Sequence, residues 1–215
     1  MPTVLVSSLP YLLQGAVNTL WMSAVCVTLG TVVGVVIGIL SVLAPAVIRW
    51  MITAYVFVFR GTPVLVLMFL AYFALPAFGL MINVFVAVGG ALVLYTGSFV
   101  AEITRGAILS IPRGQVDAAK SLGMRWGLIL RQIILPQALK MSLPPLLNNS
   151  VIMIKATSYA SIVGVWELTY AAREIVERSL AAFQIFLGVM AIYFLICYPL
   201  SVLARRLEKR AAFIH

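Results

Sequence analysis

Residues 105–140 read RGAILSIPRGQVDAAKSLGMRWGLILRQIILPQALK, the longest polar stretch in an otherwise apolar chain. Pro112 can open a helix at its first turn, Asp117 suits the early part of that helix through the macrodipole, and Gly123 can end it. Beyond Gly123, apolar residues recur at roughly helical spacing until Pro136 interrupts them. This stretch is therefore predicted to form a helix, a turn, a second helix and a break at Pro136.

The first of these two helices carries small residues, Ala118, Ala119 and Ser121, that expose its backbone. A short helix of this kind suits docking into a groove on another protein. An amphipathic helix lying along the membrane interface is an equally good interpretation. The residues by themselves leave both interpretations open.

Outside this stretch the chain is strongly apolar. It has 215 residues, of which 63% are hydrophobic and 10% are charged, whereas a soluble domain has roughly 25% charged residues. Three long segments carry no charge at all: 1–48, 61–101 and 179–204. Because a membrane-spanning helix needs about 20 apolar residues, the sequence predicts an all-α integral membrane protein.

The uncharged segments and the apolar run around Lys155 predict five transmembrane helices. The middle segment holds two spans that turn near 75–79, and residues 11–17 precede the first span as a segment along the membrane interface. We expect a single transmembrane domain over 1–215, in which loop 105–140 joins the third and fourth spans. The predicted spans are 19–43, 61–76, 84–104, 143–166 and 181–204.

The positions of Lys and Arg orient these spans, because basic residues collect on the cytoplasmic side of a membrane protein. The basic tail 205–210 is placed in the cytoplasm, and the odd number of spans then leaves the N-terminus outside. Arg60 and the basic residues of loop 105–140 also fall on the cytoplasmic side, while Arg173 and Arg178 lie outside. The net charge of +9 is a signal of topology and not of nucleic-acid binding, since the charges do not form one groove.

The sequence lacks the residues that are typical of several classes of membrane protein. The acidic residues fall at helix ends or in loops, so no proton relay is predicted at mid-membrane depth. No lysine follows a glycine, as a nucleotide-binding P-loop requires, and the two cysteines give no disulfide framework or metal spacing. A membrane enzyme is excluded for want of a catalytic constellation. The chain is therefore predicted to form half of a transport pathway and to take its energy from a partner.

Loop 105–140 contains Asp-Ala-Ala at 117–119, Gly at 123 and Ile-x-Leu-Pro at 133–136. This pattern resembles the loop signature of permease subunits of bacterial ABC importers, in which the first residue is normally glutamate. Further stretches resemble the polar amino acid uptake family of the histidine, lysine, arginine and glutamine type. They are FRGTP at 59–63, AEI at 101–103, SIPRGQ at 110–115, LPQAL at 135–139 and GVWELT at 164–169.

The resemblance implies a permease of the type I ABC importer fold that moves polar amino acids, or amino acid derivatives, across the bacterial inner membrane. Its partners would be a second permease, homologous or identical, two ATP-binding cassette subunits in the cytoplasm and a periplasmic or lipid-anchored solute-binding protein outside. ATP and Mg would bind to the ATPase subunits, so no cofactor and no catalytic centre is expected on this chain. The alternative is an ATP-independent secondary carrier or channel that acts as a homo-oligomer.

The same resemblance implies that segment 112–125 is a coupling helix that transmits ATP-driven movement. Arg113, Asp117 and Arg125 would contact the ATPase subunit. Ala118 and Ala119 would permit close approach, and Gly123 would allow the tight turn. Asp117 replaces the usual glutamate, which keeps the charge and shortens the side chain by one methylene.

The fourth predicted span contains one lysine, Lys155, within LLNNSVIMIKATSYASIVGVWE at 146–167. An isolated ammonium at mid-span costs several kcal/mol, so this side chain must pair, face water or reach toward the interface. At 100° per residue, one helix face collects the following side chains. They are Asn148, Val151, Ile152, Lys155, Tyr159, Ile162 and Trp166.

The resemblance assigns a substrate pathway to six residues: Lys155, Thr157, Ser158, Tyr159, Ser98 and Glu102. In permeases of this kind the stretch normally reads Lys, an acid, Thr, Ser, and here Ala156 replaces the acid. Either the substrate is not recognised through that contact, or a second, different permease carries the acid in an asymmetric pair.

Simpler structural roles also fit three of these positions. Lys155 can brace the subunit interface without contacting substrate. Thr157 and Ser158 can bond to carbonyls of their own helix, and Glu102 can pair with Arg105 one turn later.

Overall fold

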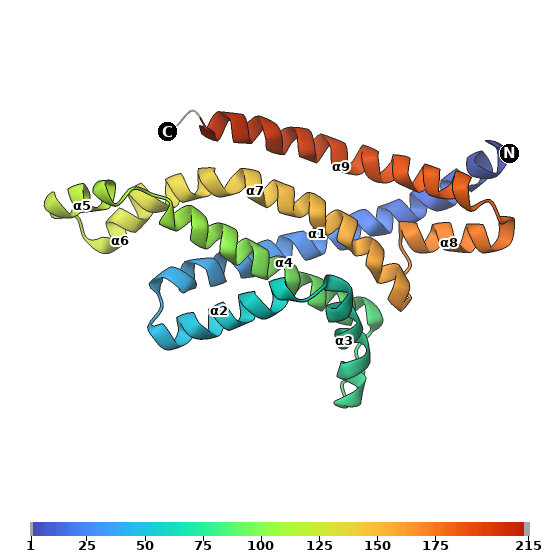
Figure 1. The fold of residues 1–215 in the computed structure, drawn as a ribbon, viewed down its shortest axis with the longest axis horizontal. Coiled ribbons are helices and arrows are strands. Elements are labelled where there is room, and N and C mark those ends of the chain that lie inside the picture. Colours follow the sequence, from blue (N-terminus) through green and yellow to red (C-terminus); the bar gives the residue numbers. More distant parts are fainter. Residues whose placement is uncertain (1, 213–215) are drawn as a thin grey trace.

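The computed structural model describes residues 2–212, with side chains for residues 4–209, and the chain is helical through most of this range (Figure 1). The helices are α1 Pro2–Leu43, α2 Ala46–Gly61, α3 Val64–Ala77, α4 Val84–Leu109, α5 Arg113–Ser121, α6 Trp126–Ile129, the π-helix η1 Leu130–Ile134, α7 Leu135–Ala156, the 3₁₀-helix η2 Thr157–Val163, α8 Leu168–Ser179 and α9 Ala182–Ala212. The predicted all-α class is confirmed.

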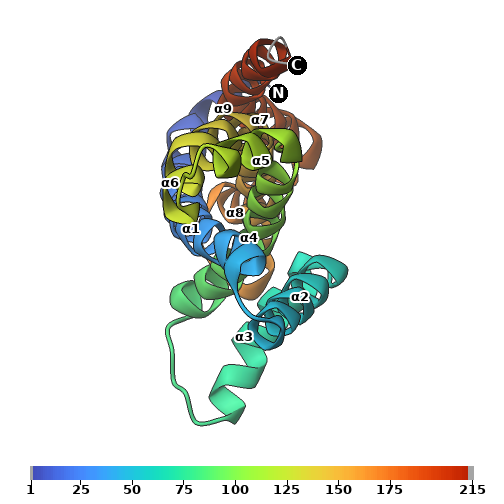
Figure 2. The same ribbon diagram turned by 90° about the vertical axis from the view of Figure 1, so that its left-hand side faces the viewer.

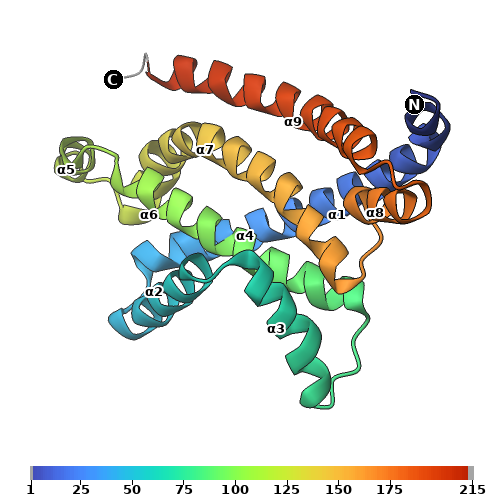
Figure 3. The same cartoon turned by 45° about the vertical axis from the view of Figure 1, so that its right-hand side comes forward.

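Four helices, α1, α4, α7 and α9, run side by side along the long axis of the molecule (Figures 1 and 3). We call one end of this bundle the α5 end, because α5 and α6 lie there together with the α1–α2 turn and the end of α9. The opposite end, which holds α8 and the start of α1, is the α8 end. Seen from the α5 end, α2 and α3 lie to one side of the bundle (Figure 2).

Within the described residues, three helices are long and apolar enough to cross a membrane by themselves: Val4–Leu43, Val84–Leu109 and Ala182–Lys209. Two bent pairs reach the same standard together. Ala46–Gly61 joins Val64–Ala77 at 104°, and Trp126–Val163 joins Leu168–Ser179 at 49°. If each bent pair counts as one span, the described residues contain five spans, the number that the sequence predicts. The residues at which the predicted spans begin and end are not tested.

A stripe of glycines holds α1 against α4. Gly30, Gly34 and Gly38 recur every fourth residue, so they share one face of α1. A Cβ atom added at Gly30 would lie 2.5 Å from the Cβ of Thr96, and one added at Gly38 would lie 2.6 Å from the Cβ of Thr104. Only glycine allows the two backbones to approach this closely, as is usual where helices pack inside a membrane.

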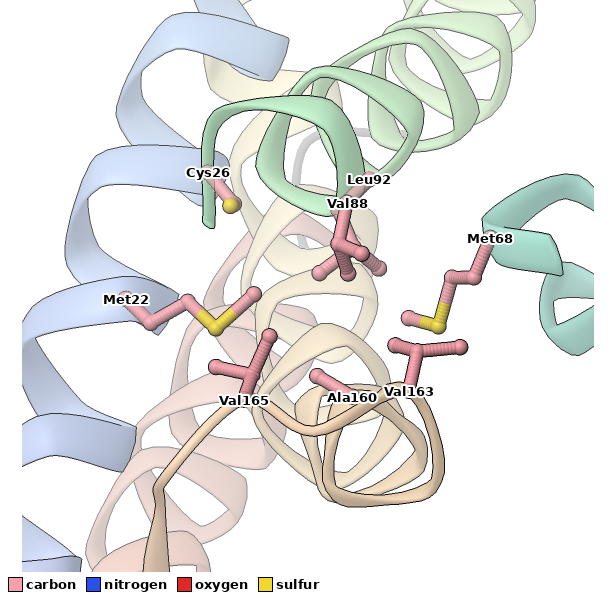
Figure 4. Packing of buried hydrophobic residues seen from close by; sticks show 8 residues of the cluster. All are labelled: Met22, Cys26, Met68, Val88, Leu92, Ala160, Val163 and Val165. Carbon is pink, nitrogen blue, oxygen red and sulfur yellow. The ribbon is translucent and has the colours of Figure 1, made fainter. Parts of the chain in front are cut away.

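A buried apolar cluster packs the first turns of α3 and the 3₁₀-helix η2 against α1 and α4 (Figure 4). Met68 of α3 meets Val88 and Leu92 of α4, while Ala160 and Val163 of η2 close the other side. Cys26 of α1 belongs to the same cluster as a free buried thiol. This packing sets the position of the end of α7, where Lys155 lies.

Residues 11–17 do not form a segment separate from the first span, which corrects the prediction. They belong to α1, which continues without a break from Pro2 to Leu43. Leu12 and Ala16 are buried among Leu168, Ala172 and Ile185 of α8 and α9. Leu12 and Ala16 thus have protein neighbours, which a single sequence did not reveal, while Leu13 and Val17 stay exposed.

The predicted break at Pro136 is also wrong. The helix passes through η1 and continues as α7 to Ala156, with Pro136 at the second position of α7. The wider π turn before Pro136 shifts the backbone hydrogen bonding and so accommodates a residue that has no N–H donor. Two more prolines, Pro144 and Pro145, are accommodated further along the same helix.

Candidate functional site

Lys155 is exposed and lines a cavity of about 290 Å³ that lies beside α3, α4, α7 and η2. We call this the Lys155 cavity. Its walls are Val64, Tyr95, Ile152, Met153, Lys155, Ala156 and Tyr159. Within residues 4–209 the structure shows no ion pair to the lysine ammonium. The cavity therefore presents one cation, two phenol groups and an otherwise apolar wall.

The predicted helix face around Lys155 is confirmed in part. Ile152, Tyr159 and Ile162 are exposed with Lys155, whereas Trp166 lies beyond the end of η2 and packs against Tyr11 of α1. Val151 was placed on the same face, but it is buried against Cys197 of α9. The face that points away from the bundle is therefore narrower than the sequence suggested.

A series of side-chain hydrogen bonds turns the end of α7 into the 3₁₀-helix η2. The hydroxyls of Thr157, Ser158 and Ser161 each donate to the carbonyl three residues earlier, at 2.7 Å. These hydrogen bonds satisfy carbonyls at the end of α7. The simpler role proposed for Thr157 and Ser158, bonding to their own helix, is confirmed.

The structure brings only some of the predicted pathway residues together. Lys155 and Tyr159 share the cavity, and Ala156 also lines it, so an acid at that position would face the same space. Thr157 and Ser98 are fully buried outside the cavity, and the Ser98 hydroxyl bonds to the Tyr95 carbonyl. Tyr95 was missed, because a tyrosine inside an apolar span carries no signal of its own in a single sequence.

Arg60 lies deeper than its sequence position predicted. Its guanidinium sits over the ring of Phe99, 5.1 Å from the ring centre. Since α4 continues for ten residues beyond Phe99, Arg60 is about 15 Å from the end of that helix. Arg60 therefore does not lie at the end of α4, because α2 runs alongside α4 before the chain bends into α3. Its placement on the cytoplasmic side remains a prediction.

Glu102 and Arg105 form the ion pair expected from their spacing, with Arg105 Nε and Nη2 at 3.1 and 2.5 Å from the two carboxylate oxygens. They line a second cavity of about 380 Å³, nearer the α5 end. We call this the Arg49 cavity. Its walls are Ser41, Val42, Arg49, Ile52, Thr53, Val56, Ala101, Glu102, Arg105 and Leu109. Glu102 is thus not brought to Lys155.

The helix predicted between Pro112 and Gly123 is α5, and Gly123 ends it as expected. Gly123 has φ +75°, its N–H bonds to the Lys120 carbonyl at 2.9 Å, and the Met124 N–H bonds to the Ala119 carbonyl at 3.1 Å. This is a Schellman ending with glycine in the left-handed position. A residue with a side chain would be strained there.

Most of the predicted coupling residues lie on the outer surface of α5 or just after it. Arg113, Asp117, Ala118 and Arg125 are exposed, and Asp117 pairs loosely with Lys120 at 3.7 Å. Ala119 is different, because only 3% of it is exposed and it packs in a cluster with Ile129 and Ile134. Of the two alanines, only Ala118 is available for close approach by a partner.

At the α8 end, two carboxylates join α1, α8 and α9. Glu167 is fully buried and accepts hydrogen bonds from Thr19, Tyr193 and the Tyr170 N–H at 3.0 to 3.1 Å. It was predicted only as a residue at the end of the fourth span, and the structure makes it the N-cap of α8.

Glu174, in the loop expected to lie outside the membrane, accepts from the Tyr11 hydroxyl at 2.6 Å and from Trp166 Nε1 at 3.0 Å. Glu174 therefore joins α8 to α1, while Arg173, Glu177 and Arg178 are the exposed charges of this helix.

Comparison with known proteins identifies the family. Residues 30–213 match the binding-protein-dependent transport system inner membrane component family. The chain belongs to this family. It is an inner membrane permease that crosses the membrane several times.

Two relatives extend over nearly the whole chain. The glutamine transport system permease protein of Escherichia coli is 40% identical over 206 residues, which cover 94% of each chain. A probable amino-acid ABC transporter permease protein of Bacillus subtilis is 37% identical over 210 residues, covering 96% of this chain and 92% of the relative.

Solved structures agree with these sequence relatives. A chain from the crystal structure of an amino acid ABC transporter with histidines superposes with a TM-score of 0.90 at 34% identity, covering 95% of this chain and 96% of the other. A chain of a methionine ABC transporter in an inward-facing conformation gives a TM-score of 0.76 at 20% identity, covering 94% of this chain and 97% of the other. The second comparison supports the fold alone, and together they identify the type I ABC importer permease fold.

Proposed function

We propose that this chain is the permease subunit of an ATP-driven ABC importer that carries polar amino acids, or their derivatives, across the bacterial inner membrane. The observation that carries the proposal is Lys155, a cation within a predicted span that opens into a cavity and forms no ion pair within residues 4–209. The relatives named for glutamine and amino acid transport support the substrate class.

The chemistry of the Lys155 cavity favours a ligand with a carboxylate. The ammonium offers three donors, and Tyr95 and Tyr159 add two phenol groups beside it. About 290 Å³ lies near the lower limit of small-molecule pockets and suits an amino acid. Ala156 offers nothing to a cationic side chain, so this chain by itself favours zwitterionic or acidic amino acids over basic ones.

The partners follow from the two ends of the molecule. We place the α5 end in the cytoplasm, where Arg113, Asp117 and Arg125 would contact one of two ATPase subunits. We place the N-terminus and α8 outside, where α8 would meet the solute-binding protein. ATP and Mg would bind to the ATPase subunits and no cofactor to this chain.

A second permease completes the pathway. We favour an asymmetric pair in which a different permease carries an acid where this chain has Ala156. Gentle purification of the tagged chain and identification of the co-purifying proteins tests this point. The ATPase together with a second permease supports the asymmetric pair, whereas the ATPase with this permease alone indicates a homodimer.

Transport by the purified complex in proteoliposomes tests the function itself. With binding protein outside the vesicles and ATP available to the ATPase subunits, we expect uptake of radiolabelled glutamine or glutamate that stops when ATP is withheld. Uptake that continues without ATP would instead favour the carrier or channel alternative. Failure to take up any of a panel of amino acids, despite ATP hydrolysis stimulated by the binding protein, would contradict the proposed substrate class.

A further inference from the structure

The Arg49 cavity lies between the α1–α2 turn and the last turns of α4. Ser41 and Val42 come from the end of α1, Arg49 comes from the first turns of α2, and Arg105 comes from α4. Its volume of about 380 Å³ is large enough for a small charged group with part of its carrier. Neither the coupling helix nor the Lys155 cavity includes its two arginines.

The charges of this cavity leave one cation free. Arg105 is held by Glu102 through two hydrogen bonds, so these two residues largely neutralise each other. The Arg49 guanidinium has no ion pair and no hydrogen bond within the part of the chain whose side chains are described. The cavity therefore carries a net positive charge and attracts an anionic group.

The depth of the cavity matches the headgroup layer of a bilayer. Arg105 lies one turn before the end of α4 at Leu109, and Glu102 lies about 10 Å from that end by helical rise. Next to Arg49, Trp50 is 73% exposed, and exposed tryptophans gather where headgroups meet hydrocarbon. A ligand at this level would lie beside lipid phosphates.

The walls of the cavity decide between a soluble anion and an amphiphile. Five of the lining residues are apolar: Val42, Ile52, Val56, Ala101 and Leu109. A small soluble anion gains nothing from such walls, whereas a lipid can place its glycerol and upper acyl carbons against them. Basic pockets between transmembrane helices on the cytoplasmic side commonly bind anionic headgroups in this way.

We propose that the Arg49 cavity binds the phosphate headgroup of an anionic phospholipid. Arg49 contacts the phosphate, since a guanidinium matches phosphate oxygens in geometry and charge. Arg105 adds a weaker contact because Glu102 competes for its donors. The proposal concerns membrane lipid and holds whichever amino acid the importer carries.

The test measures lipid binding to the full-length chain purified in detergent, by native mass spectrometry with added phosphatidylglycerol or phosphatidylcholine. We expect wild-type protein to retain phosphatidylglycerol in preference. Arg49→Gln should weaken this binding roughly fivefold, the effect of one cation near an anionic surface, and Arg49→Lys should restore most of it. Arg131→Gln, which removes an exposed cation of η1 that does not line the cavity, serves as the matched control and should bind as wild type does.

Glu102→Gln provides a second test, in which binding is expected to increase, and a misfolded variant would not give that result. Removing the carboxylate frees Arg105, so phosphatidylglycerol should bind more tightly than to wild type. Tighter binding of phosphatidylethanolamine to wild type, lost in Glu102→Gln, would assign the cavity to a zwitterionic headgroup and overturn the proposal. Equal effects of Arg49→Gln and Arg131→Gln would overturn it as well. So would displacement of the lipid by millimolar glycerol phosphate, which would point to a soluble phosphate ester.

Discussion

Lys155 illustrates how the cost of one charge within a predicted membrane span limits the role of a residue. An ammonium at mid-span loses hydration worth several kcal/mol, and no acid of this chain is paired with it within residues 4–209. Its side chain is open to a cavity with Tyr95 and Tyr159. A ligand carboxylate, or an acidic group from a second permease, would stabilise the charge of Lys155 at this position.

Replacing Lys155 with methionine keeps the length and apolar body of the side chain and removes its charge. We expect uptake to fall by about tenfold to a hundredfold, the loss of one charge-assisted hydrogen bond of about 1.5–3 kcal/mol. Lys155→Arg should retain more transport. Ile162→Met, on the same exposed face but outside the cavity, is the control. Normal uptake by Lys155→Met would show that Lys155 does not bind substrate and would leave it a structural role between subunits.

Ala156 gives a prediction of gained function. It lines the Lys155 cavity, so Ala156→Glu should place a carboxylate where a basic side chain of a substrate can reach it. The ratio of arginine to glutamine uptake should rise, because an opposite charge favours the cationic ligand. Ala156→Gln has nearly the same size without the charge and should leave the ratio unchanged. An equal rise in both variants would show that cavity shape, and not charge, sets the preference.

At the scale of single elements, α5 was predictable because its signals are local. Pro112 precedes it, Gly123 takes the left-handed position after it, and both act through their own backbone. The continuation beyond it was not predictable in the same way. A single π turn before Pro136 allows the helix to continue into α7. The residue types alone do not distinguish a continuous helix from one that ends at Pro136.

Gly123 allows the coupling role of α5 to be tested separately from folding of the spans. A β-branched residue at φ +75° costs roughly 1–2 kcal/mol or more, so Gly123→Val should distort the end of α5. We expect the variant to insert into the membrane and to lose ATP-driven uptake. Gly123→Asn, which tolerates this conformation, should transport nearly normally. The comparison is uptake per unit of ATP hydrolysed, and an unchanged ratio in Gly123→Val would remove the turn from the coupling mechanism.

At the scale of the whole molecule, the sequence predicted the fold class and missed how helices meet. Charge-free segments mark spans because charges are costly in lipid. The depth of Arg60 and the burial of Leu12 and Ala16 depend on neighbours far away in the chain, which one sequence does not reveal. The candidate site follows the same division: Lys155 was visible as an isolated charge, whereas Tyr95 became part of the cavity only through packing of α4 against α7.

The glycine stripe of α1 allows the close packing of α1 on α4. A side chain at Gly34 would collide with Val100 and lie 2.6 Å from the Gly97 carbonyl oxygen. Gly34→Leu should therefore separate the two helices and destabilise the protein by about 1–3 kcal/mol, the usual cost of overpacking. Gly90→Leu, on α4 where an added Cβ meets nothing within 4 Å, is the matched control. Thermal unfolding of the purified chain in detergent measures the difference in stability between the two variants. Because Tyr95 of α4 lines the Lys155 cavity, the Gly34 variant should also lose transport. Equal melting temperatures for the two variants would show that α1 and α4 can move apart without loss of stability, contrary to the close packing described here.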